Sequence, residues 1–74
     1  MRYIHKKSKK AIVKFEVRKS AQKLFGVTSM PDFPMLVGIG EDGNVYPICF
    51  ADGNAEKDAK LIEQVISSDY EVEQ

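Results

Sequence analysis

Apolar and polar residues alternate along residues 11–18, which read Ala-Ile-Val-Lys-Phe-Glu-Val-Arg. Val13, Phe15 and Val17 would share one face of an extended strand, with the two-residue period of a half-buried sheet. A helix is the alternative, since Val13 and Val17 are also about one helical turn apart. β-Branched and aromatic side chains are typical of strands, so the pattern favours a strand over residues 11–18.

Two interpretations fit the segment that precedes this strand. Tyr3 and Ile4 predict a short partner strand, with Lys6–Lys10 as the turn of a short hairpin. Otherwise residues 1–10 form a flexible basic arm, because the ends of a chain are ordered only where something ties them down.

A short helix and then a loop are predicted after the strand. Ser20 is a suitable N-cap for a helix over residues 21–25, and Gly26 is suitable at its C-terminal end. Two prolines interrupt the following segment, residues 27–34, which predicts a loop.

Asp42-Gly43 separates two apolar runs, residues 35–40 and 44–50. The dipeptide suits the positive φ angles of a two-residue turn and therefore predicts a hairpin. Such a turn fixes the pairing register, and this register gives the core face Met35, Val37, Ile39, Tyr46, Ile48 and Phe50. The opposite, bare face then carries Leu36, Gly38, Gly40, Val45, Pro47 and Cys49. Because Pro47 has no backbone N–H to donate, we expect residues 44–50 to form an edge strand.

The last third of the chain predicts a long amphipathic helix. Asn54 is a suitable N-cap, and the helical period continues to about Ser67. Its apolar face consists of Ala55, Ala59, Leu61, Ile62, Val65 and Ile66. Asp58 falls within this apolar arc, and we interpret it as a first-turn acid that the helix dipole stabilises. Residues 69–74 alternate apolar and acidic side chains and predict a short strand or an acidic tail.

These elements predict one α+β domain over residues 1–74. It is a small two-layer domain: an antiparallel sheet of about three to four strands, one main C-terminal helix on one face, and a short helix near residues 20–25. The predicted core consists of Val13, Phe15, Val17, Leu24, Val37, Ile39, Ile48, Phe50, Ile62 and Ile66. A second sheet face would be left bare unless something covers it.

Charge is balanced in total but uneven along the chain. Eleven basic and eleven acidic residues give a formal net charge of zero. Nine of the basic residues precede residue 30 and face only Glu16, whereas two basic and ten acidic residues follow. A basic half is typical of proteins that contact an anionic partner, which here would be nucleic acid or an anionic protein surface. The candidate nucleic-acid-binding residues are Arg2, Lys6, Lys7, Lys9, Lys10, Lys14, Arg18, Lys19 and Lys23.

The sequence offers little material for catalysis or for a cofactor. His5 and Cys49 are its only histidine and cysteine, whereas a zinc site needs about four such ligands. Residues 38–43 match a dinucleotide-binding glycine pattern, but a strand rather than a helix is predicted after them. Residues 52–63 resemble a calcium loop in their acid spacing, but Lys57 stands where the loop needs glycine. We therefore predict no catalytic residue, no metal site, no cofactor and no enzymatic activity.

The expected function is that of a small, non-catalytic, intracellular binding protein located in the cytoplasm. No apolar run approaches the roughly 20 residues that a membrane-spanning helix needs. A nucleic-acid-associated role through the basic half is narrowly favoured. The alternative is a protein-binding module, an inhibitor or adaptor or a homodimer, that uses the strand over residues 44–50 and the bare sheet face. Its candidate contact residues are Leu36, Val45, Pro47 and Cys49.

Overall fold

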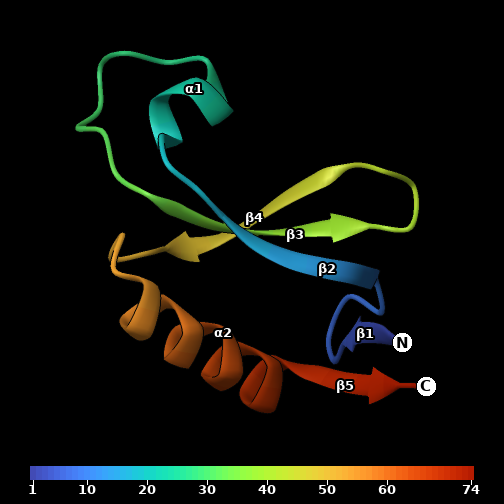
Figure 1. Cartoon of the computed structure of the whole chain (residues 1–74). Helices are drawn as coiled ribbons and strands as arrows, with labels where there is room; N and C mark the ends of the chain where they lie inside the picture. Colours follow the sequence, from blue (N-terminus) through green and yellow to red (C-terminus); the bar gives the residue numbers. More distant parts are fainter.

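The computed structural model describes residues 1–74 and contains five strands and two helices (Figure 1). In chain order these are β1 (Arg2–His5), β2 (Ala11–Arg18), α1 (Ala21–Phe25), β3 (Met35–Gly40), β4 (Val45–Phe50), α2 (Ala55–Asp69) and β5 (Tyr70–Glu73). The predicted α+β class is confirmed, with a main C-terminal helix and a short helix.

The strands form one antiparallel sheet in the order β4-β3-β2-β1-β5. The sheet therefore has one strand more than the expected maximum, because residues 70–73 pair with β1 instead of forming a tail. The short N-terminal hairpin is also present, since β1 pairs with β2 through Tyr3 and Ile4. β4 lies at one edge, as the proline at position 47 predicts.

Both helices begin at the predicted caps. The Ser20 hydroxyl accepts a hydrogen bond from the backbone N–H of Lys23, and Gly26 closes α1 with φ at 70°. The Asn54 side chain accepts hydrogen bonds from the second and third residues of α2. α2 continues two residues beyond the expected end, to Asp69, and leads directly into β5.

Asp58 does more than interact with the helix dipole. Asp58 is 6% exposed, and its carboxylate accepts hydrogen bonds from the backbone N–H groups of Asp52 at 2.8 Å and Gly53 at 3.0 Å. These donors belong to the turn between β4 and α2. Asp58 therefore ties the start of the helix to the end of the sheet, which explains an acid within an apolar arc.

The hairpin register differs from the predicted one. Ile39 lies opposite Val45, and the Gly40 N–H donates to the carbonyl of Asn44, so the loop has three residues, 41–43. Gly43 has φ at 81°, as a three-residue loop that ends in a left-handed residue requires. A register shift near Ile48 then adds one residue to β4. As a result, Met35 lies opposite Phe50, as in the predicted register.

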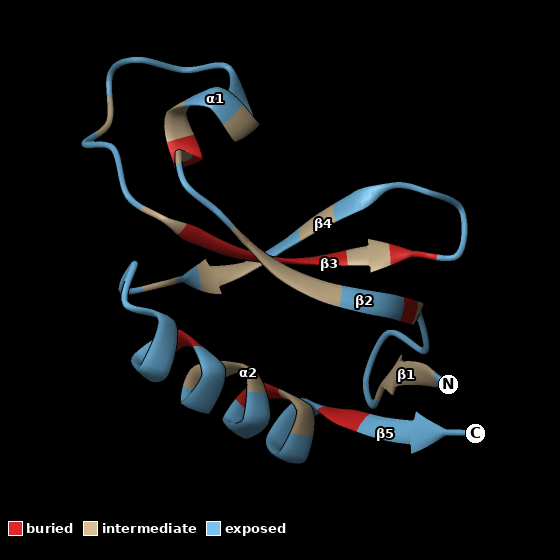
Figure 2. Cartoon of the chain, viewed as in Figure 1, coloured by how far each residue is buried: buried red, intermediate tan, exposed pale blue.

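The changed register places Tyr46 and Ile48 with Leu36 instead of with Val37 and Ile39. Leu36 is fully buried, and Tyr46, Ile48 and Cys49 pack with it in the core cluster that also contains Val65 of α2. The expectation that Leu36 and Cys49 belong to a bare face is therefore wrong. Buried residues concentrate on β3 because layers cover it from both sides (Figure 2).

The opposite face of the sheet has a core of its own. Ala21 of α1 packs with Met35 and Val37, and Leu24 and Met30 complete this second cluster. The short helix and the loop after it form a partial third layer (Figure 1). The second face is therefore only partly bare, which a two-layer arrangement did not anticipate.

Two predicted core residues are exposed. The register of β2 shifts between Ile12 and Lys14, so Ile12 is 2% exposed while Val13 is 44% exposed. Beyond the bulge, Phe15 and Val17 do pack against the core under α2. Phe50 is 55% exposed because it lies at the end of an edge strand, on the face away from α2.

Candidate functional site

The structure divides the nine predicted nucleic-acid-binding residues between two ends of β2. The turn before β2 carries four lysines at positions 6, 7, 9 and 10. The other end carries Arg18, Lys19 and Lys23, which line a shallow hollow beside α1. Arg2 and Lys14 lie in strands between these groups.

Three of the nine basic side chains are already paired with acids. Arg2 bonds Glu41 of the hairpin loop and Glu73 of β5, and the bond to Glu41 is the main cause that raises the pKa of its guanidinium. Lys14 and Arg18 both pair with Glu16. Arg2 is the only one of the nine that forms an ion pair with the acidic half of the chain. The two halves therefore do not neutralise each other within the fold.

The other six basic residues are lysines without an ion pair, namely Lys6, Lys7, Lys9, Lys10, Lys19 and Lys23. Four of these are the exposed lysines of the β1–β2 turn, which we call the lysine turn (residues 6–10). Its backbone is held by a bond from the Lys9 N–H to the His5 carbonyl. The His5 ring Nδ1 accepts from the N–H groups of Lys7 and Ser8. The turn is ordered by these backbone bonds, and none of its four lysine side chains forms an ion pair.

The lysine turn lies against the C-terminal end of α2. The Lys6 backbone N–H donates to the Asp69 carbonyl at 2.9 Å, and Lys6 Nζ donates to the Ser68 carbonyl at 3.3 Å. α2 has no basic residue in its own last turn. Lys6 therefore supplies a positive charge where the helix dipole favours one, and it fixes the turn in place.

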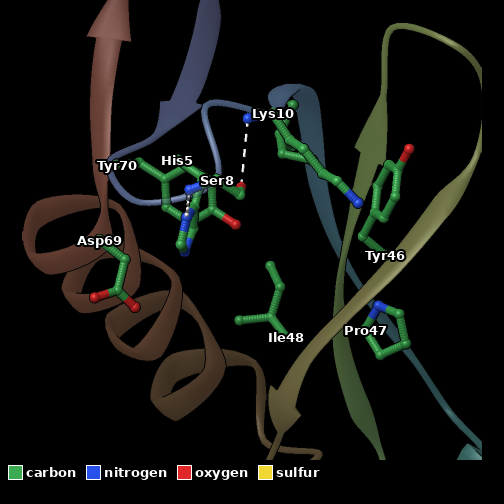
Figure 3. A pocket seen from close by; sticks show the side chains of 9 residues that line it. His5, Ser8, Lys10, Tyr46, Pro47, Ile48, Asp69 and Tyr70 are labelled. Atoms are coloured by element: carbon green, nitrogen blue, oxygen red, sulfur yellow. Dashed lines mark hydrogen bonds between the residues drawn. The ribbon is translucent and has the colours of Figure 1, made fainter.

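A cleft of about 320 Å³ opens between the lysine turn, β4 and the end of α2 (Figure 3). Ile12 and Ile48 provide apolar lining, and Pro47 lies at the β4 side. The polar and aromatic lining comes from His5, Ser8, Lys10, Tyr46, Asp69 and Tyr70. Residues from distant parts of the chain thus surround one hollow.

Two aromatic groups lie on opposite sides of this cleft. On one side, the Tyr46 ring has Lys10 Nζ 4.5 Å from its centroid. On the other side, His5 and Tyr70 form an edge-to-face pair with ring centroids 5.1 Å apart. Figure 3 shows Lys10 reaching toward Tyr46, with Ile48 between the two sides.

Hydrogen bonding fixes the position of Tyr46. Its hydroxyl donates to the Asp42 carboxylate at 2.7 Å. This bond lowers the pKa of Asp42 and raises the pKa of Tyr46. Gly40 leaves room for the ring, because a Cβ atom there would lie 2.8 Å from Tyr46 Cε2. The hairpin loop and its glycine therefore hold the aromatic side chain at the cleft.

The predicted protein-contact residues do not form one surface. Val45 and Pro47 are exposed on β4, opposite Ile39 and Val37 on the face away from α2. Leu36 is fully buried and is unavailable to any partner of the folded protein. Cys49 is half-buried on the α2 side, where burial, with a smaller effect of Asp69, raises the pKa of its thiol.

Sequence reasoning found the lysines of this site but not the cleft beside them. The sequence pattern places Tyr46 on the predicted core face of the hairpin and Tyr70 in the predicted terminal strand or acidic tail. The useful signal was the pair of glycines in β3, Gly38 and Gly40, which indicates that side chains from neighbouring strands pack against bare backbone. No sequence motif indicated that Asp69 would line the cleft.

No group of three or more histidine, cysteine, aspartate or glutamate side chains converges as a metal site would require. Neither helix is long and apolar enough to cross a membrane. Comparison of the chain with known protein families, with curated proteins and with solved structures found no significant match in any of the three.

Proposed function

We propose that this chain is a non-catalytic, nucleic-acid-associated protein that contacts phosphates through the lysine turn. The observation that carries the proposal is the absence of any ion pair at the four exposed lysines of this ordered turn. Exposed, unpaired lysines attract the nucleic-acid backbone and release its counterions. No acid of the C-terminal half neutralises these lysines, since Arg2 alone among the nine basic residues forms ion pairs with that half.

A paired set of charge variants tests this proposal. Lys7→Gln with Lys9→Gln removes two charges from the turn, and Lys57→Gln with Lys60→Gln removes the same number from α2. Binding of a fluorescein-labelled single strand of about 12 nucleotides is followed by anisotropy between about 50 and 200 mM salt. We expect the turn variant to lose about tenfold in affinity and to reduce the salt slope by about 1.4, because each phosphate contact contributes about 0.7 on a single strand.

The α2 variant is the control, because it has the same net charge as the turn variant. It should keep the parent's affinity within about twofold and keep the parent's salt slope. Equal affinities and slopes for all three proteins would remove the turn from the binding site. A parent that binds no oligonucleotide at the lowest salt concentration would contradict the proposed function itself.

A second candidate function is protein binding at the β4 edge. Phe33 and Phe50 form an edge-to-face pair with ring centroids 5.2 Å apart, and both rings are about half exposed. Val45 and Pro47 extend this exposed apolar surface along the edge strand. Exposed apolar groups beside unpaired strand groups are typical of interaction surfaces.

Self-association is the form of protein binding that can be tested directly. Sedimentation velocity over a range of protein concentrations should show a dimer, which Phe50→Ser should weaken at least about fivefold. Val72→Ser is the matched control, because Val72 is similarly exposed on the opposite edge strand. A parent that stays monomeric throughout, or equal weakening by both variants, would contradict self-association at this edge.

A further inference from the structure

We propose that the cleft beside the lysine turn accepts one unpaired base of a single-stranded nucleic acid, stacked on Tyr46, with its phosphate toward Lys10. This inference rests on the proposed function and names the class of nucleic acid. It is carried by the composition of the cleft, in which aromatic, apolar, cationic and acidic groups from three parts of the chain meet (Figure 3).

The size of the cleft suits a single small group. Its volume of about 320 Å³ is at the lower end of the range for small-ligand pockets, roughly 300–1,000 Å³. Its apolar lining from Ile12 and Ile48 favours a flat, poorly hydrated ring over an isolated phosphate. A base inside a duplex is already stacked and paired, so only an unpaired base can enter.

The Tyr46 ring provides the stacking surface. Its hydroxyl is held by Asp42, so the ring is oriented before any ligand arrives. Lys10 Nζ occupies the ring in the free protein, at 4.5 Å from the centroid. Lys10 is exposed, and its ammonium can move from the ring to a phosphate when a base takes its place. Every base has a π face, so this stacking tolerates any sequence.

The hydrogen-bonding groups of the cleft orient a nucleotide. His5 Nδ1 accepts two backbone N–H bonds, which places the ring proton on Nε2 and makes it a donor. The Ser8 hydroxyl accepts from the Lys10 N–H and keeps its own hydrogen to donate. Asp69 is an acceptor on the α2 side of the cleft. A phosphate is therefore favoured at the lysine turn and disfavoured near Asp69, where a base N–H group can donate instead.

The test compares one labelled sequence of about 12 nucleotides as a single strand and as a duplex. We expect Tyr46→Leu to weaken binding of the single strand about tenfold and to leave duplex binding within twofold. Tyr46→Phe is the matched control, because it keeps the ring and loses only the hydroxyl. It should bind the single strand within about threefold of the parent. Thermal melts show whether each variant is folded.

A measurement on the parent protein keeps the proposal testable if Tyr46→Leu fails to fold. The aromatic proton resonances of Tyr46 should show the upfield shifts of base stacking on titration with the single strand but not with the duplex. If the lysine-turn variant weakens binding while Tyr46 variants and these resonances do not respond, the base-binding cleft is wrong and the proposed function stands. If the parent binds neither oligonucleotide, both are wrong.

Discussion

Replacing Leu36 with alanine should lower the free energy of unfolding by about 3 kcal/mol. Leu36 is fully buried on β3 and packs in the cluster that joins the sheet to α2. Its truncation removes apolar contacts and leaves a cavity that this thin core can fill only in part. Domains of this size have a total stability of roughly 4–11 kcal/mol, so the loss is a large fraction of the whole. Chemical denaturation, followed by circular dichroism, measures it.

Val45→Ala is the matched control for this prediction. A two-residue hairpin turn would place Val45 and Leu36 on the same sheet face, whereas the observed register separates them. Val45 is 36% exposed at the edge strand, so its truncation should cost less than about 1 kcal/mol. Similar losses for the two variants would contradict the three-residue loop and the assignment of Leu36 to the α2 side.

Replacing Asp58 with alanine should lower the free energy of unfolding by about 2 kcal/mol. The carboxylate accepts two backbone N–H bonds from the turn at residues 52–53 and is almost fully buried. Alanine leaves both donors without a protein partner, although water can reach this exposed turn. Asp58→Asn keeps one acceptor oxygen, so we expect about half of that loss. Both losses of unfolding free energy are obtained from the denaturant concentrations at the unfolding midpoints, with the same dependence of free energy on denaturant concentration for each variant.

Glu56→Ala separates the hydrogen bonds of Asp58 from the helix dipole. Glu56 is also an acid in the first turn of α2, but it is exposed. Removing it should cost no more than about 0.5 kcal/mol, which is the usual size of the dipole interaction. An Asp58→Ala loss as small as that of Glu56→Ala would show that the two N–H bonds contribute little.

Local sequence patterns were sufficient for most element positions. The N-caps Ser20 and Asn54 and the closing Gly26 mark helix ends through bonds and backbone angles within a few residues. The alternation over residues 11–18 identified a strand, and Pro47 identified a sheet edge. These signals succeed because their physical causes are local.

The sheet face on which each side chain lies was harder to predict, because a register shift of one residue moves every side chain of a strand to the other face. The bulge in β2 exposes Val13 and buries Ile12, and the three-residue hairpin loop turns Tyr46 to the sheet face that Leu36 occupies, under α2. The sequence Asp42-Gly43 fits both a two-residue and a three-residue loop. Only packing against two helices on opposite faces selects one register.

At the candidate site, residue order is enough to place four lysines on one turn and ten of the eleven acidic residues after residue 30. Tertiary structure alone decided which of the basic residues are neutralised, because Arg2 meets Glu41 and Glu73 across long sequence separations. It also assembled the cleft, in which Tyr46, Asp69 and Tyr70 join the lysine turn. Charge and capping follow from neighbouring residues, whereas a cleft depends on strand order and helix placement, which are set by burial over the whole chain.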